Sequence, residues 1–99
     1  MEIVKSQQDG KVVFTLTGRL DTNTAPEFQA ALLSVFDGDK YVVLDFAGLE
    51  YISSAGLRVL LLGEKTAKMK DSAMSLINVR EEIREVFEMT GFTDILKIV

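Results

Sequence analysis

Tyr51-Ile52-Ser53-Ser54-Ala55-Gly56-Leu57-Arg58 is the stretch of sequence around which the fold of this chain is organised. It follows an apolar run over residues 41–46, interrupted only by Asp45, and leads into a second run over residues 57–62, interrupted only by Arg58. A short run that is apolar on both faces is typical of a central parallel strand, and a segment that is apolar nearly all round predicts a helix packed on more than one side. We therefore expect the chain to leave a buried strand, cross the surface through residues 47–52 and begin a helix with two hydroxyl groups in its first turn.

The residues before this stretch predict an N-terminal hairpin followed by a helix. Strands are expected over residues 2–6 and 11–17, joined at Gln8-Asp9-Gly10, because Asp-Gly tolerates positive φ. Residues 18–23 are expected to form a loop. Thr24-Ala25-Pro26-Glu27 then has the pattern of a capping box with proline in the first turn, and apolar side chains at helical spacing continue this helix to about residue 36.

The residues after it predict two further helices and two further strands. The second helix is expected over Ser54 to Met69, and a strand over residues 73–77. Asn78 is the expected N-cap of a third helix, which Gly91 ends as a left-handed C-cap, and residues 95–99 are expected to form a last strand.

The predicted order is therefore β-β-α-β-α-β-α-β, in a single domain that spans residues 1–99. The fold class is α/β. A small mixed β-sheet is expected, in which an N-terminal hairpin is extended by right-handed parallel β-α-β crossovers and covered by three helices.

The residue types that are missing exclude most catalytic and metal-binding chemistry. The chain has no His, no Cys and no Trp, so it lacks an imidazole base, a thiolate nucleophile and the usual ligands of zinc and iron–sulfur sites. We therefore expect neither an enzyme nor a bound cofactor or metal. The formal net charge is −4 and the basic residues are scattered, with only Lys65, Lys68 and Lys70 gathered near the end of a predicted helix, which argues against direct binding of nucleic acid.

No apolar segment approaches the ~20 residues of a membrane span, and the first residues lack a secretory apolar region. Together with the absence of Cys, this predicts a cytoplasmic protein without membrane insertion. The sequence does not fix the oligomeric state, and we expect a monomer or a weak dimer.

The two serines at the start of the predicted second helix have two physical interpretations. Serine is a favoured N-cap, and replacing a capping serine with alanine typically costs about 1 kcal/mol. The same position has unpartnered backbone N–H groups and a positive helix dipole, so a phosphate on Ser53 or Ser54 would be tolerated there. One serine can cap while the other is exposed and modified, so the residue pattern leaves both interpretations open.

Three stretches together resemble the STAS domain of bacterial anti-sigma factor antagonists: Ile52 to Arg58, Gly18-Arg19-Leu20-Asp21, and Met89-Thr90-Gly91-Phe92. The resemblance implies a partner-switching cycle. In that family the unphosphorylated antagonist binds an anti-sigma factor, often a serine kinase of the GHKL ATPase type, and thereby frees a sigma factor. The kinase then phosphorylates the antagonist at the start of the second helix, and a PP2C-type phosphatase resets the cycle.

By motif position, the resemblance implies that Ser54 is the phosphoacceptor. One common form of the motif is Asp-Ser-(Ser/Thr)-Gly, with an acidic residue before the acceptor. In this chain Ser53 precedes Ser54 and Ala55 follows it, so Ser53 is a second candidate acceptor.

The resemblance also implies a partner-binding surface around the serines. Its candidate residues are Asp21, Asn23, Glu50, Tyr51, Ser53, Ala55, Gly56 and Arg58. Some of them have local alternatives. Gly56 allows tight packing, a bare surface that a partner's backbone can approach, or both together. Arg58 pairs with a phosphoserine or a partner carboxylate, or is simply solvated, and Asp21 and Asn23 suit a turn. Asp45 is interpreted as a structural or contact residue and not as a metal ligand.

Two other functions remain open at this point. In the second, the chain keeps the STAS fold but serves as an accessory subunit of a lipid-transport ATPase, or as another signalling scaffold that needs no phosphorylation. A third possibility, from a different class, is a small phosphate- or nucleotide-binding enzyme that uses the helix start at residues 53–56. The lack of His and of a P-loop argues against it.

Overall fold

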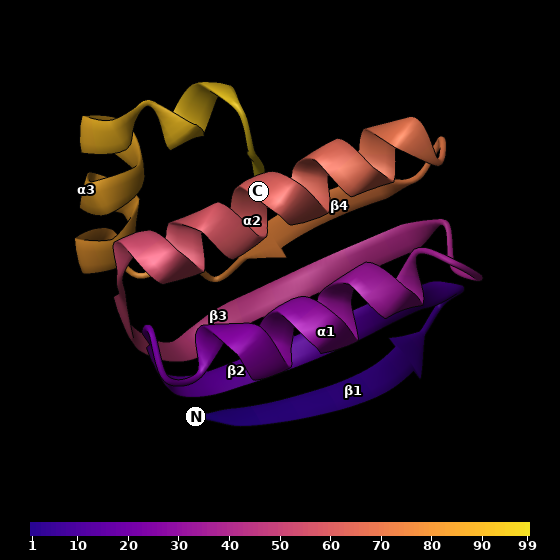
Figure 1. Cartoon of the computed structure of the whole chain (residues 1–99), viewed down its shortest axis with the longest axis horizontal. Helices are drawn as coiled ribbons and strands as arrows, with labels where there is room; N and C mark the ends of the chain where they lie inside the picture. The colour runs from indigo at the N-terminus through magenta and orange to yellow at the C-terminus, as the bar shows by residue number, and fades with distance from the viewer.

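The computed structural model of the chain, which describes all residues from 1 to 99, contains five strands, three α-helices and one 3₁₀ turn (Figure 1). The elements in chain order are β1 (Glu2–Gln8), β2 (Lys11–Leu20), α1 (Ala25–Val35), β3 (Tyr41–Ile52), α2 (Ser54–Met69), β4 (Ala73–Ile77), α3 (Glu81–Thr90), η1 (Phe92–Asp94) and β5 (Lys97–Ile98). The predicted order of strands and helices is confirmed. No helix combines the length and the apolar character needed to cross a bilayer.

The strands form one mixed sheet in the order β1-β2-β3-β4-β5. β1 and β2 are antiparallel, and every later neighbour pair is parallel, as the hairpin and crossovers predict. The hairpin turn has φ 53° at Asp9 and φ 79° at Gly10. Two successive positive φ values are typical of a type I′ turn, which matches the twist of the two strands, so the Asp-Gly prediction is confirmed.

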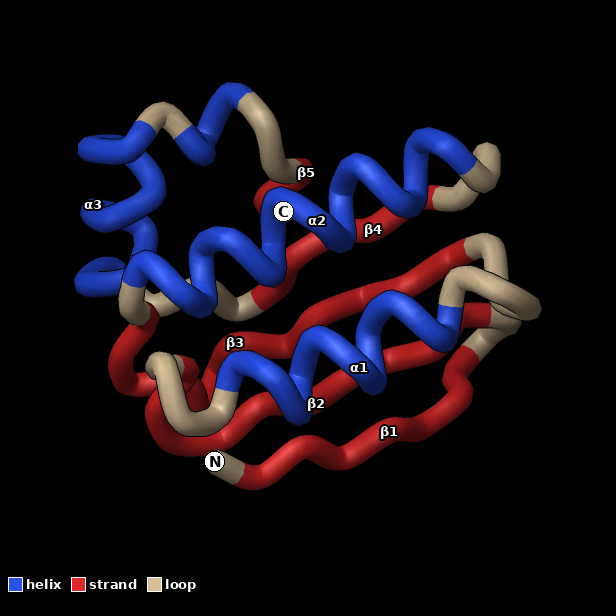
Figure 2. Tube along the Cα trace, in the orientation of Figure 1, coloured by secondary structure: helices blue, strands red, loops and turns tan.

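One face of the sheet is covered by α1 and α2, which lie side by side, while α3 lies beyond one end of α2 (Figures 1 and 2). The alternating residues Val12, Phe14 and Leu16 point toward this helical layer and are at most 1% exposed. They belong to a single cluster of 22 buried apolar residues that also includes Phe28 of α1 and Phe87 of α3. The core therefore holds α1 and α3 against the sheet, together with α2, whose Val59 and Leu60 belong to the same cluster.

β2 and β3 are longer than expected, and they stay paired up to their last residues at one end of the sheet. Residues 18–20 and 47–52, which were predicted as loops, continue the two strands and pair with each other after register shifts between Thr15 and Thr17 and between Gly18 and Arg19. Gly48 makes this close approach possible. A Cβ atom there would lie 3.0 Å from Thr17 Oγ1 and 3.2 Å from the Leu16 carbonyl oxygen.

Two predicted helix starts differ from the structure, α1 in its capping bonds and α3 in its capping residue. Thr24 precedes α1, but its side chain caps nothing in the helix, so no capping box forms with Glu27. Asn78 adopts φ 56° and donates from Nδ2 to Asp45 Oδ1, so α3 begins only at Glu81, after Arg80. Gly91 ends α3 with φ 81°, which confirms the predicted left-handed C-cap.

The last predicted strand is shorter than expected, and only Lys97–Ile98 pair with β4. The N–H groups of Ile95 and Leu96 instead donate to the Phe92 carbonyl oxygen, at the end of η1.

Candidate functional site

The serine stretch lies at the end of the sheet where β2 and β3 both stop. Arg19 pairs in register with Tyr51, and Leu20 with Ile52. The Ser53 N–H then donates to the Leu20 carbonyl oxygen at 2.9 Å, which ties the start of α2 to the end of β2. The loop before α1 and the first turn of α2 are therefore neighbours in space.

The two serines differ sharply in their surroundings. Ser53 holds the N-cap position of α2 in an extended conformation, and its carbonyl oxygen accepts the Leu57 N–H at 3.0 Å. Its hydroxyl makes no capping bond, and the Oγ atom is buried without any hydrogen-bond partner. Ser54 is the first residue of the helix and is exposed. The Ser53 side chain therefore does not cap α2. Of the two serines, only Ser54 is exposed to solvent, while Ser53 is half-buried.

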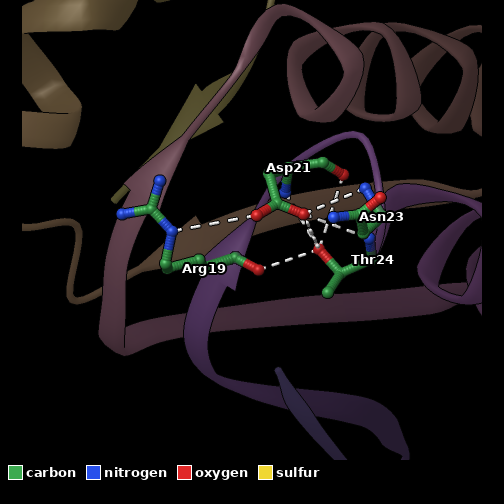
Figure 3. Close-up of polar contacts among 4 residues, drawn as sticks. All are labelled: Arg19, Asp21, Asn23 and Thr24. Carbon is green, nitrogen blue, oxygen red and sulfur yellow. Dashed lines mark hydrogen bonds and ion pairs between the residues drawn. The ribbon is translucent and has the colours of Figure 1, made fainter.

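Asp21 organises the loop that leads into α1 (Figure 3). Its Oδ1 accepts hydrogen bonds from the N–H groups of Asn23 at 3.0 Å and Thr24 at 3.2 Å. The Thr24 hydroxyl donates to the Arg19 carbonyl oxygen at 2.8 Å and accepts the Asp21 N–H at 2.9 Å. The loop is thus a closed set of local bonds, and the turn interpretation of Asp21 is confirmed.

The same contacts shift the pKa of Asp21. Partial removal from water raises the pKa of this carboxyl group, but the hydrogen bonds from the Thr24 and Asn23 N–H groups and from the Thr24 hydroxyl, with the nearby Arg19 guanidinium, outweigh that effect. The pKa of Asp21 therefore lies below its ordinary value, and the carboxylate carries a negative charge at neutral pH.

Arg19 is part of this site, although the sequence analysis assigned it no role. Its Nε lies 3.8 Å from Asp21 Oδ2, and its Cζ lies 4.0 Å from the centroid of the Tyr51 ring. The guanidinium thus covers one face of the Tyr51 ring, and Tyr51 as a residue is still 40% exposed. The signal that would have found Arg19 is its pairing with Tyr51, which depends on the register of β2 and β3 and is not visible in the sequence.

The remaining predicted site residues divide into surface and interior. Asn23, Glu50 and Arg58 are exposed, and Ala55 is half-buried. Gly56 is buried in the free protein, which bears out its tight-packing interpretation, while its place on the partner-binding surface stays a prediction. A Cβ atom there would lie 2.8 Å from both Ile52 Cγ1 and Leu20 Cγ, and the absent side chain therefore lets α2 approach the ends of β2 and β3.

Asp45 lies on the open side of the sheet and has a structural role. Its Oδ1 accepts the Ala47 N–H at 3.0 Å and the Asn78 side-chain amide at 3.1 Å, which links β3 to the start of the α3 region. No group of three or more acidic side chains gathers in the molecule in a way that would hold a metal ion.

Comparisons with known proteins show what the chain is similar to. The family model described as STAS domain matches residues 2–99. BtrV of Bordetella bronchiseptica, which carries the name of an anti-sigma factor antagonist, is 36% identical over 99 residues that cover 99% of this chain and 85% of that protein.

Two solved structures show the same fold. An anti-sigma factor antagonist from Mycobacterium paratuberculosis superimposes with a TM-score of 0.87 at 21% identity, covering 98% of this chain and 83% of that one. The Bacillus cell fate determinant SpoIIAA in its phosphorylated form superimposes with a TM-score of 0.78 at 18% identity, covering 99% and 91%. At these identities the structural likeness concerns the fold.

Proposed function

The chain belongs to the STAS domain family, and we propose that it acts as an anti-sigma factor antagonist whose partner binding is switched off by phosphorylation of Ser54. The unphosphorylated protein binds an anti-sigma factor that is also a GHKL-type serine kinase, and this binding releases a sigma factor. A PP2C-type phosphatase removes the phosphate and restores binding. The chain itself acts by binding and not by catalysis, and the cycle runs in the cytoplasm.

The observation that carries the proposal is the contrast between Ser53 and Ser54. A kinase has to bring the γ-phosphate of ATP to the acceptor oxygen, and Ser53 Oγ is buried. Ser54 is exposed at the first position of α2, where backbone N–H groups are free and the helix dipole favours negative charge. The chain accepts a phosphate there without rearrangement. A docked partner, however, would have to desolvate a group with about −1.5 to −2 charges.

The side chains around Ser54 suit a protein partner. Tyr51 offers an exposed ring that Arg19 holds in place, and aromatic and arginine side chains are frequent anchors of protein interfaces. Asn23 and Glu50 are exposed beside them, and Asp21 holds the loop that presents Asn23. The name of BtrV gives independent support for antagonism of an anti-sigma factor.

The test is a pull-down from host lysate with Ser54→Ala and Ser54→Asp as paired baits and Ser53→Ala as the control. We expect a GHKL-type kinase to be enriched on Ser54→Ala and Ser53→Ala and lost from Ser54→Asp. Incubating the wild-type protein with that kinase and ATP is expected to phosphorylate Ser54, and Ser53→Ala is expected to be phosphorylated equally well. Identical partners on the Ala and Asp baits would refute the Ser54 switch, and an ATPase with a permease among them would point to the transport-accessory role.

A further inference from the structure

A groove between α1 and α2 opens beside the serine stretch, where the two helices lie side by side (Figure 2). It is open to solvent and has a volume of about 490 Å³, and most of its lining side chains are small. Ala25 and Val59 are at most 5% exposed and form its floor, while Ala30 is exposed at its rim. An apolar cavity of roughly 150 Å³ accepts benzene, so the groove has room for a large apolar side chain.

Arg58 is the one charged residue that lines this groove. It is exposed, and the three ion pairs of the molecule, which involve Arg19, Lys68 and Lys70, leave its guanidinium without a carboxylate partner. A free guanidinium at the edge of an apolar groove favours an occupant that carries a carboxylate next to its apolar group. The net charge of −4 would otherwise repel such an occupant.

Ser54 precedes Arg58 by four residues on α2, so the two side chains lie one turn apart on the same helical face. Ala55, between them in sequence, lines the groove. A phosphate on Ser54 is therefore within reach of the Arg58 guanidinium and close to the mouth of the groove. It would compete for Arg58 with any carboxylate bound there and would repel that carboxylate as well.

We infer that the α1–α2 groove receives a large apolar side chain of the anti-sigma factor, whose neighbouring carboxylate pairs with Arg58, and that phosphoserine 54 ejects this segment by taking over the Arg58 guanidinium. The inference rests on the proposed function, because it takes the anti-sigma kinase as the occupant. It adds the chemistry of the docked segment and a named residue through which the phosphate acts. The free energy that separates the two proteins after phosphorylation then comes from local electrostatic interactions at Arg58, and the fold of the chain does not have to change.

The first test measures the dissociation constant of the purified kinase, identified by the pull-down, for variants made in the Ser54→Ala background so that no phosphate forms. Ala30→Glu places a carboxylate in the groove, and Ser34→Glu places the same charge at an exposed position one turn further along α1, outside the groove. We expect Ala30→Glu and Arg58→Gln each to weaken binding about ten- to hundredfold. Arg58→Lys is expected to retain part of the affinity, and Ser34→Glu to bind like its parent.

The outcomes separate the two proposals. If the kinase distinguishes Ser54→Ala from Ser54→Asp but binds Ala30→Glu and Arg58→Gln as tightly as the parent, the groove is not the docking site and the antagonist function stands. Melting curves of each variant show whether it is folded. Because Ala30 and Arg58 are both exposed, we expect these curves to match the parent.

The second test needs no kinase. Phosphoserine is incorporated at position 54 during translation, and its second pKa is followed by ³¹P NMR in the full chain with Arg58 and in the Arg58→Gln variant. Capture of the phosphate by Arg58 predicts a pKa that is lower in the protein with Arg58 and rises toward the ordinary value of about 6 in Arg58→Gln. Equal pKa values in the two proteins would overturn the assigned role of Arg58, whether or not the protein is an anti-sigma factor antagonist.

Discussion

At the scale of single residues, the missing side chain of Gly56 sets how closely α2 approaches the sheet. A Cβ atom there would overlap Ile52 Cγ1 and Leu20 Cγ at 2.8 Å, and both of those side chains are themselves buried. Ile52 and Leu20 are the last residues of β3 and β2, and the Leu20 carbonyl oxygen accepts the Ser53 N–H just before α2 begins at Ser54. The position of the Ser54 hydroxyl is therefore coupled to the core packing around Gly56, two residues further along α2.

We predict that Gly56→Ala lowers the free energy of unfolding by about 1–3 kcal/mol, because overpacking outweighs the better helix propensity of alanine. Thermal unfolding is the measurement, and for a domain of this size each kcal/mol corresponds to roughly 4–8 °C in melting temperature. Gly38→Ala is the matched control, since a Cβ atom at that position meets nothing within 4 Å. A Gly56→Ala variant that keeps the parent melting temperature but loses its partner would place Gly56 on the contact surface.

At the scale of elements, the loop between β2 and α1 is held by the carboxylate of Asp21. Its pKa is depressed in the folded protein, so the carboxylate stabilises the fold fully above the unfolded value of about 3.9. As the pH falls from there through the folded value, the unfolded chain binds the proton first and the stabilisation is lost. Asp21→Asn keeps an oxygen acceptor for the turn but carries no charge.

We therefore predict that wild type is more stable than Asp21→Asn at pH 7 and that the difference shrinks as the pH falls below about 4. Urea unfolding at a series of pH values is the measurement. Asp94→Asn serves as a control, because Asp94 is exposed and no hydrogen bond to its side chain holds a turn. A difference that stays constant down to pH 3 would mean that the turn geometry, and not the charge, accounts for the effect of Asp21.

The elements also show what local sequence could and could not predict. The Asp-Gly hairpin, the Ser54–Met69 helix and the left-handed cap at Gly91 follow from short-range chemistry, and all three were predicted correctly. The last three residues of β2 and the second half of β3 were mistaken for loops because Gly18 and Gly48 interrupt their patterns. Those segments become strands only because they pair with each other, which is a tertiary effect.

In the candidate site, too, some features follow from local sequence and others depend on tertiary packing. Ser54, Asp21 and Tyr51 were found because the motif places them, but the burial of Ser53 Oγ and of Gly56 depends on how α2 packs against β2. Arg19 was missed because its contact with Tyr51 depends on the register between two strands. The groove beside Ser54 requires both helices to be placed, so no local pattern indicates it.

At the scale of the whole molecule, a phosphate on Ser54 would change the protein surface and leave the packing of the hydrophobic core unchanged. The 22-residue core cluster contains neither Ser54 nor Arg58, and α2 begins at Ser54 without a side-chain cap on its free N–H groups. A negative charge at this end of the helix should therefore stabilise the fold and not disrupt it. Loss of partner binding after phosphorylation would then be a change of surface chemistry alone.

We predict that Ser54→Asp raises the free energy of unfolding by about 0.3–1 kcal/mol at low ionic strength, with the gain reduced by added salt. Met69→Asp is the matched control, because Met69 is 80% exposed at the opposite end of the same helix, where the dipole is negative and the same charge should destabilise by a similar amount. Urea unfolding of the three proteins at low and high salt measures both effects. If Ser54→Asp instead unfolds more readily than wild type, its failure to bind the kinase would reflect a damaged fold, and the switch would have to be sought in stability and not at the surface.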